Sequence, residues 1–265
     1  MAMGVISSTS ITTLSPGMHI SVPSGRGDNA GHVGGTEVEL RTVVREEGVV
    51  GCFVECFGEG LNSLSATQRA CISNMTPEYG STCTLFPVDE KTLDYLRLTG
   101  RSEEHIALVE AYAKAQGFWN DPDSTQRVYS KVLELDLSSV TRSVAGPSRP
   151  HDRIDVTRAK QAFDRICSER KLDTEKTVEV NILGETQELS HGALAIAAVT
   201  SCTTATDASM MLAAGVLARN AQAAGLHPKP WVKTILAPGS RATEDILDAA
   251  GLMPALRDLG FYTCG

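Results

Sequence analysis

The strongest hydrophobic pattern in the chain is the uncharged run at residues 193–199, which predicts a strand buried on both faces. A polar string follows and ends in Asp207, a residue type that often caps the amino end of a helix. The next apolar residues recur at helical spacing and predict one buried helix face: Met210, Met211, Ala214, Leu217 and Ala218. Cys202 therefore lies in a turn between a strand and a helix.

The rest of the chain alternates between strand-like and helix-like segments. Strands are predicted at 49–57, 81–86, 129–137 and 231–236, with a hairpin at 177–189 that turns at 183–186. Helices are predicted at 36–47, 65–80, 91–96, 103–116, 158–171 and 243–250, with Tyr112 among the inward residues of the fourth. This alternation indicates an α/β fold with mostly parallel sheets covered on both faces, in three layers.

Composition suggests where the domains lie. Residues 1–35 are rich in Ser, Thr and Gly and are expected to form a flexible N-terminal arm. Residues 143–157 contain a Gly- and Pro-rich stretch and are predicted to be a linker. The first α/β domain is then expected at 36–142 and the second at 158–265.

Overall charge and cysteine usage narrow the class of protein. The 265-residue chain has a formal net charge of −8, which argues against binding nucleic acid or an anionic membrane through a broad basic face. It has no apolar run near the ~20 residues of a membrane span. Its seven cysteines lack C-x-x-C spacing, and no secretory signal is recognised, so we expect reduced thiols and a cytoplasmic protein.

Two places in the sequence suggest chemistry. The Cys202 thiol, near the unpaired N–H groups and positive dipole end of a helix, is predicted to be a metal ligand or a reactive thiol. The alternative is a small buried cysteine that only fills space. Asn74 and Glu78 are four residues apart, so one helix would present both on the same face. Such a pair could hold a hydroxylated acid or move a proton, or simply end the helix.

The order of several motifs resembles that of the aconitase family from about residue 36 to residue 261. The segment AAVTSCTT at 197–204 is similar to the family's cysteine loop, which contains I-T-S-C-T-N. The other similar segments are GVVG at 48–51, EG at 59–60, NMTPEYG at 74–80, FPVDE at 86–90, LTGR at 98–101, PWVKT at 230–234, APGS at 237–240 and GL at 251–252. Residues 145–153, AGPSRPHDR, are similar to the family's A-G-P-K-R-P-Q-D-R stretch.

The chain also departs from the family pattern. Family members hold an iron–sulfur cluster with one cysteine of the S-C-T-N loop and two of a later G-C-T-T-C-I-G motif. Only Cys202 clearly corresponds, because the final residues read GFYTCG: Cys264 could be a remnant of the later pair, but Phe261 then stands where its partner thiol is needed. Thr204 replaces the loop asparagine. One thiolate cannot hold such a cluster. We therefore expect a middle piece of an aconitase-like protein, with no metal and no cofactor.

The resemblance implies roles for the site residues. Asn74 and Glu78 would line the active site, with Glu78 as acid/base beside a substrate hydroxyl and Cys202 as a thiol donor or nucleophile. The remaining candidates would bind substrate carboxylates: Ser201, Thr203, Arg149, Arg153, Ser240 and Arg241. Ser240 and Arg241 open a helix whose N–H groups and guanidinium suit a carboxylate. The alternative for Arg149 and Arg153 is that they are solvated surface charges, and the alternative for Arg241 is that it is a surface arginine beside a structural turn.

Two classes of function remain open. The first is a lyase or isomerase that dehydrates, hydrates or isomerises a polycarboxylate or a related biosynthetic acid, without an iron–sulfur cluster. The second is a non-catalytic aconitase-like subunit that binds a partner protein. A small-molecule carboxylate is the expected ligand of the first. A homodimer or a partner subunit is expected for both, because missing flanking domains would leave apolar surface exposed.

Overall fold

The computed structural model describes residues 18–21, 46, 48–121, 129–137, 140–141, 143–146, 148, 152–200, 203 and 206–264. Contacts divide the chain into two compact units, Met1–Val156 and Thr157–Gly265. The predicted domain limits stay predictions. The helix expected at 36–47 lies almost wholly outside the described residues.

The first unit contains a four-stranded parallel sheet in the order β3-β2-β1-β4. Its strands are β1 (Met18–Ser21), β2 (Phe53–Phe57), β3 (Cys83–Leu85) and β4 (Val132–Glu134). The sequence predicted no strand at β1, which it placed within a flexible arm, yet β1 pairs with both β2 and β4. The strand predicted at 49–57 starts only at Phe53, because Gly48 and Gly51 adopt positive φ angles in a preceding turn.

One face of this sheet packs against helices. Val54 and Cys56 of β2 are buried in a core with Leu61, Ile72 and Tyr79. These come from the 3-10 helix η2 (Glu59–Ser63), α2 (Ala66–Asn74) and α3 (Thr76–Tyr79). The alternate residues of the strands are more exposed. Parallel sheets within a mixed α/β fold are confirmed, whereas the three-layer arrangement stays a prediction.

Helix starts in this unit follow the side-chain signals in the sequence. Ser65 and Gln68 form a capping box at the start of α2, a sequence signal that agrees with the helix predicted to begin at residue 65. Asp89 caps α4 (Glu90–Leu98), and Ser102 caps α5 (Glu103–Ala115). Tyr112 of α5 is exposed, so the prediction that it faces inward is wrong.

A buried ion pair connects α2 to the start of α4. Arg69 Nη2 donates to Asp89 Oδ2 at 2.7 Å and to the Leu61 carbonyl oxygen at 2.8 Å. The other Asp89 oxygen accepts from the backbone of Lys91 and Thr92. A single aspartate thus both caps α4 and neutralises a guanidinium that is almost fully buried.

The first unit ends in a short antiparallel strand pair. β5 (Ser143–Ala145) pairs with β6 (Arg153–Asp155), and the 3-10 helix η5 (Val156–Arg158) follows. Both strands lie within the stretch predicted to be a linker.

The second unit opens with α6 (Ala159–Glu169) and a hairpin of β7 (Thr177–Ile182) and β8 (Glu185–Ser190). The predicted hairpin is therefore confirmed. Beyond it, Gly192 lies so close to the Phe163 ring that a Cβ there would be 2.8 Å from a ring carbon. This close approach fixes the exit of the hairpin against α6.

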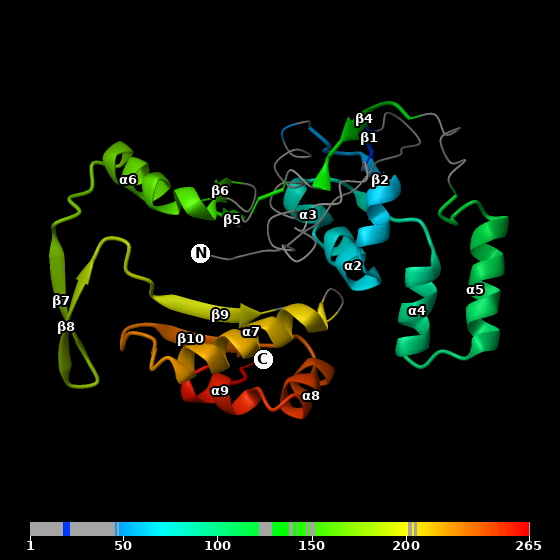
Figure 1. Cartoon of the computed structure of the whole chain (residues 1–265). Coiled ribbons are helices and arrows are strands. Elements are labelled where there is room, and N and C mark those ends of the chain that lie inside the picture. Colours follow the sequence, from blue (N-terminus) through cyan, green and yellow to red (C-terminus); the bar gives the residue numbers. More distant parts are fainter. Residues whose placement is uncertain are drawn as a thin grey trace. The chain divides into compact units, whose positions relative to one another are not determined.

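The core of the second unit covers one face of a two-stranded parallel sheet. β9 (Ile196–Thr200) pairs with β10 (Lys233–Ala237), and α7 (Ala208–Ala223), α8 (Arg241–Ala249) and α9 (Met253–Asp258) pack together beside them (Figure 1). Asp207 caps α7 as predicted. α9, which packs on α7, was not predicted.

Two burial predictions for this unit are wrong. β9 was expected to be buried on both faces, but its Ile196 side chain is 56% exposed, because α7 to α9 cover only the opposite face. Leu217 is also exposed, while Met211, Gly215 and Ala218 form the buried face of α7. No helix within the described ranges is both long and apolar enough to cross a membrane.

Candidate functional site

The loops that follow β9 and β10 meet at one edge of the second unit's sheet. Ala237, the last residue of β10, is in register with Thr200, the last residue of β9. Both loops therefore leave the carboxyl edge, where open α/β sheets usually bind ligands. The Thr203 hydroxyl donates a hydrogen bond to the Gly239 carbonyl oxygen and joins the two loops. The structure thus brings Thr203 close to the start of α8.

The start of α8 carries two of the predicted carboxylate-binding residues. Ser240 is its cap, and the Ser240 Oγ accepts from the Thr243 amide at 3.3 Å. Arg241 follows, with a side chain 91% exposed and its Nε 4.0 Å from Asp245 Oδ1. So loose a surface contact holds the guanidinium weakly. Backbone N–H groups of the first helical turn and a cation on the same turn can together bind a carboxylate.

Cys202 and Ser201 lie outside the described residues. Their neighbours are described, since β9 ends at Thr200 and Asp207 caps α7. The predicted position of Cys202 between a strand and a helix agrees with this order of elements.

Asn74 and Glu78 are not on one helix, contrary to the prediction. α2 ends at Asn74, and Met75, with φ −92° and ψ 14°, separates it from α3, which carries Glu78. Both residues are exposed on the corner between the two helices. The corner lies near the amino end of β3, because α3 ends at Tyr79 and β3 begins at Cys83. Between them, the Thr82 amide donates to the carbonyl oxygen of Cys52, just before β2.

Arg153 is engaged within the β5–β6 pair. Its Nε donates to Ser143 Oγ at 3.0 Å, and its Nη2 donates to Thr141 Oγ1 at 2.9 Å. Thr141 Oγ1 in turn donates to Asp155 Oδ2 at 2.9 Å. These contacts, which the sequence did not suggest, stabilise the strand pair through Arg153. The other arginine of the motif, Arg149, lies outside the described residues.

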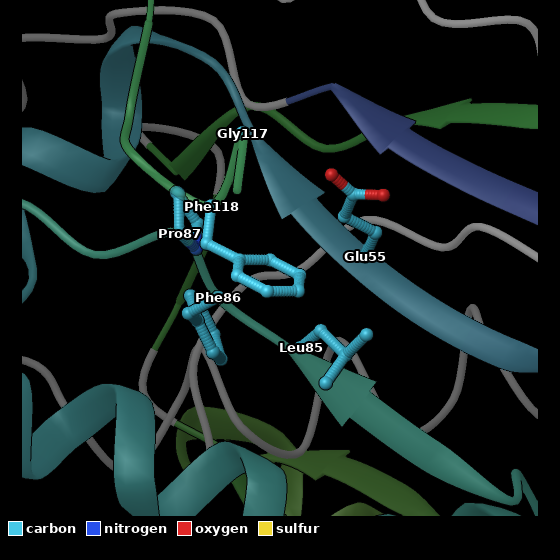
Figure 2. A pocket seen from close by; sticks show the side chains of 6 residues that line it. All are labelled: Glu55, Leu85, Phe86, Pro87, Gly117 and Phe118. Carbon is cyan, nitrogen blue, oxygen red and sulfur yellow. The ribbon is translucent and has the colours of Figure 1, made fainter. Parts of the chain in front are cut away.

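A shallow apolar pocket of about 220 Å³ lies on the first unit's sheet. It is lined by Glu55, Leu85, Phe86, Pro87, Gly117 and Phe118. Figure 2 shows the Phe118 ring between the Phe86–Pro87 side of the pocket and the Glu55–Leu85 side. The backbone around it is fixed by two hydrogen bonds of 2.8 Å between Val88 and the segment after α5. None of these residues was a predicted site residue.

The described residues do not supply a ligand set for an iron–sulfur cluster. A cluster of this kind needs three or four thiolates. No group of three or more His, Cys, Asp or Glu side chains in the described ranges could hold a metal ion. Cys264 is exposed, while Cys56 and Cys167 are buried.

Comparisons with known proteins agree with the motifs. The sequence profile described as "Aconitase family (aconitate hydratase)" matches residues 27–265. Aconitate hydratase A of Thermus thermophilus is 49% identical over 233 residues, which cover 84% of this chain and 26% of the relative. The Escherichia coli protein of the same name is 46% identical over 226 residues, covering 84% of this chain and 25% of the relative.

A relative with a different name is equally similar. Phosphinomethylmalate isomerase of Streptomyces viridochromogenes is 48% identical over 220 residues, which cover 82% of this chain and 25% of the relative. The chain thus spans about a quarter of the length of these curated relatives.

Proposed function

The chain belongs to the aconitase family, and from this premise we propose that it takes part in the hydration, dehydration or isomerisation of a polycarboxylate or a related biosynthetic acid. The relatives named aconitate hydratase and phosphinomethylmalate isomerase differ in name, while each matches most of this chain over about a quarter of its own length. The shared segment therefore fits a reaction class better than one particular substrate.

The observation that carries the proposal is the Thr203–Gly239 hydrogen bond, which joins two loops of the family's motifs at one sheet edge. Beside this bond, Ser240 begins α8 and Arg241 extends into solvent. In our proposal, Arg241 and the first turn of α8 bind one substrate carboxylate. Ser201 and the backbone N–H of Thr203 donate hydrogen bonds to the same group, since the Thr203 hydroxyl already donates to Gly239. Cys202, in the same loop, acts as a thiol donor or nucleophile.

Asn74 and Glu78 are proposed to handle the proton and the hydroxyl group. Glu78 would accept the proton alpha to a carboxylate and then, as an acid, return it to the hydroxyl on the neighbouring carbon, which leaves as water while the electron pair of the broken C–H bond forms the double bond. Asn74 would orient the hydroxylated acid by hydrogen bonds. Arg149 and Arg153 would stabilise the negative charge that develops on the carboxylate. Because Glu78 is exposed to water, its electrostatic interactions with a bound substrate are screened, and we therefore expect slow turnover.

The decisive experiment is an assay of the purified chain with citrate, isocitrate and cis-aconitate. Glu78→Gln should lower kcat by ~100- to 10,000-fold, the usual effect of removing a general acid or base. Glu104→Gln, a matched change at an exposed position of α5, should leave kcat unchanged. The proposal fails if wild type turns over none of these acids or if Glu78→Gln retains its full rate.

We also propose that the chain works without an iron–sulfur cluster. The support is that Cys202 is the one cysteine that clearly resembles a cluster-binding cysteine of the family, and that the described residues include no group of three side chains that could hold a metal ion. Anaerobic purification followed by iron and sulfide analysis should give substoichiometric amounts of both. Stoichiometric iron and sulfide that disappear in Cys202→Ala would contradict this proposal.

A second candidate function, a non-catalytic subunit that binds a partner chain, is favoured by the sheet of the first unit. Strand register aligns Leu85 with Glu55, and, through His19 of β1, Glu55 with Val132. Leu85 is 46% exposed and Val132 is 52% exposed. Leu85 and Val132 thus lie in one row across the sheet with Glu55 and His19 between them, and we infer that a partner chain would bind this mixed apolar and polar face.

A further inference from the structure

Three buried hydroxyl groups meet beneath the corner that carries Asn74 and Glu78. They belong to Thr76 and Tyr79 of α3 and to Thr84 of β3, and all three side chains are almost fully buried. Thr76 Oγ1 lies 2.9 Å from Thr84 Oγ1 and 3.2 Å from the Tyr79 hydroxyl. The Tyr79 hydroxyl is also hydrogen-bonded to Thr84 Oγ1. We call these residues the hydroxyl cluster.

The hydroxyl cluster also contacts carbonyl groups in the last turn of α2, which the Met75 amide at the end of the helix approaches as well. Thr76 Oγ1 donates to the Ser73 carbonyl oxygen at 2.7 Å, and the Tyr79 hydroxyl lies 3.4 Å from the Ile72 carbonyl oxygen. The last carbonyl groups of any helix need partners from outside it. The cluster therefore connects the end of α2, the whole of α3 and the middle of β3.

The corner depends on such contacts because α3 is only four residues long. A single helical turn is not stable by itself, since forming the first turn costs more than its hydrogen bonds return. Asn74 follows Ser73, whose carbonyl accepts from the cluster, and Glu78 directly precedes Tyr79. The buried residues next to Asn74 and Glu78 thus fix the backbone from which both exposed side chains extend.

We propose that Tyr79, through its hydroxyl group, is a positioning residue that holds Asn74 and Glu78 in the geometry needed for the reaction. The catalytic part of this inference rests on the proposed function. Packing alone does not require the hydroxyl, because a phenylalanine ring at this position would fill the core equally well. A buried hydroxyl is costly unless it is hydrogen-bonded, so its presence here is explained by the bonds it makes.

The experiment compares Tyr79→Phe and Thr84→Val with two matched controls in the full chain. Tyr112→Phe removes the same hydroxyl from an exposed ring, and Thr84→Ser keeps the hydroxyl while removing a methyl group. Hydrogen exchange is followed at residues 74–80, where the Glu78 amide donates to the Met75 carbonyl oxygen at the corner and the Gly80 amide donates to the Thr76 carbonyl oxygen within α3. In parallel, kcat and KM are measured with the acid that wild type turns over.

We expect Tyr79→Phe and Thr84→Val to speed exchange at residues 74–80 about tenfold, with little change elsewhere in the unit. We expect kcat to fall by roughly tenfold or more, with a much smaller change in KM, because a small misplacement of reacting groups slows chemistry steeply. Both controls should behave as wild type. The effect of the double variant should be smaller than the sum of the two single effects, since both substitutions remove the Tyr79–Thr84 hydrogen bond.

The outcomes separate this inference from the proposed function. Absence of turnover in wild type refutes the proposed function. Faster exchange in Tyr79→Phe that is confined to residues 74–80 would still support the positioning of the corner by the Tyr79 hydroxyl. Unchanged exchange at these residues in Tyr79→Phe would overturn the inference. Faster exchange throughout the first unit would also overturn it, and so would an unaltered kcat despite faster exchange at residues 74–80. Either result would mean that the Tyr79 hydroxyl stabilises the fold without positioning Asn74 and Glu78 for the reaction.

Discussion

At the scale of single residues, burial makes the Tyr79 hydroxyl a weaker acid than an ordinary tyrosine. Burial raises the pKa of the Tyr79 phenol well above its ordinary value of 10.0, and hydrogen bonds from Thr76 and Thr84 offset this only in part. The hydroxyl therefore stays protonated over the whole pH range in which the enzyme would work. It is suited to hold a hydrogen-bond network in place, but not to exchange protons with a substrate.

This shift predicts how stability depends on pH. Below pH 10 the phenol is protonated in both folded and unfolded chains, so its stabilising effect is complete. Above pH 10 the unfolded chain releases the proton while the folded chain keeps it, and the free energy of unfolding falls by up to about 1.4 kcal/mol per pH unit.

Urea unfolding at a series of pH values from 8 to 11 would measure this effect. Tyr79→Phe should start from a lower stability and show a smaller decline above pH 10 than wild type. Tyr112→Phe, which alters an exposed tyrosine, should keep the wild-type slope. Equal slopes in wild type and Tyr79→Phe would contradict the predicted titration.

At the scale of elements, the chain folds as predicted where the signal is local. The capping box of Ser65 and Gln68, the Asp207 cap and the two-strand pattern of the hairpin all act within a few residues, and each is observed. Gly80 ends α3 with a left-handed backbone, as expected of a helix-ending glycine.

Elements and exposures that depend on distant contacts were not predicted. Strand β1 has little apolar signal and exists through pairing on both of its edges. The break at Met75 interrupts an apolar pattern that reads as one helix, so the shared face of Asn74 and Glu78 was inferred wrongly. The hydroxyl cluster was missed because its Tyr79–Thr84 contact joins a helix to a strand.

The β7–β8 hairpin contains a turn that its sequence does not optimise. Leu183 and Gly184 have φ angles of 52° and 89°, as in a two-residue type I′ turn, and the Leu183 side chain is 98% exposed. A left-handed backbone costs a non-glycine residue roughly 1–2 kcal/mol, and asparagine tolerates it best. Burial of the Leu183 side chain therefore does not compensate for the strain of its backbone.

We predict that Leu183→Asn stabilises the hairpin by about 0.5–1 kcal/mol, because Asn-Gly is the preferred pair for this turn. Hydrogen exchange across residues 177–190 should slow accordingly. Leu183→Ala removes the same apolar surface without the asparagine preference, and it should give no such protection. Faster exchange in Leu183→Asn would show that the exposed leucine is held by a contact that its local geometry does not reveal.

At the scale of the whole molecule, the parallel sheet of each unit is covered on one face and leaves apolar side chains exposed on the other. The helices α7, α8 and α9 form a core over one face of β9 and β10. The first unit buries Val54 and Cys56 on one face of its sheet, while Phe53, Leu85 and Val132 stay partly exposed. Apolar residues in such an arrangement are usually covered by another chain or another part of a larger protein.

We predict that the chain self-associates, with the row of Leu85 and Val132 in the interface. A two-fold symmetric dimer is the simplest arrangement that covers the same face on both copies. Light scattering at micromolar concentration should then give a mass above the 28.2 kDa of one chain. Leu85→Ala or Val132→Ala should weaken association about tenfold or more, since each removes apolar contact area from the interface. Leu108→Ala, at an exposed position of α5, should leave it unchanged. A cleanly monomeric wild type would count against a homodimer, and it would leave a different partner chain as the cover for this face.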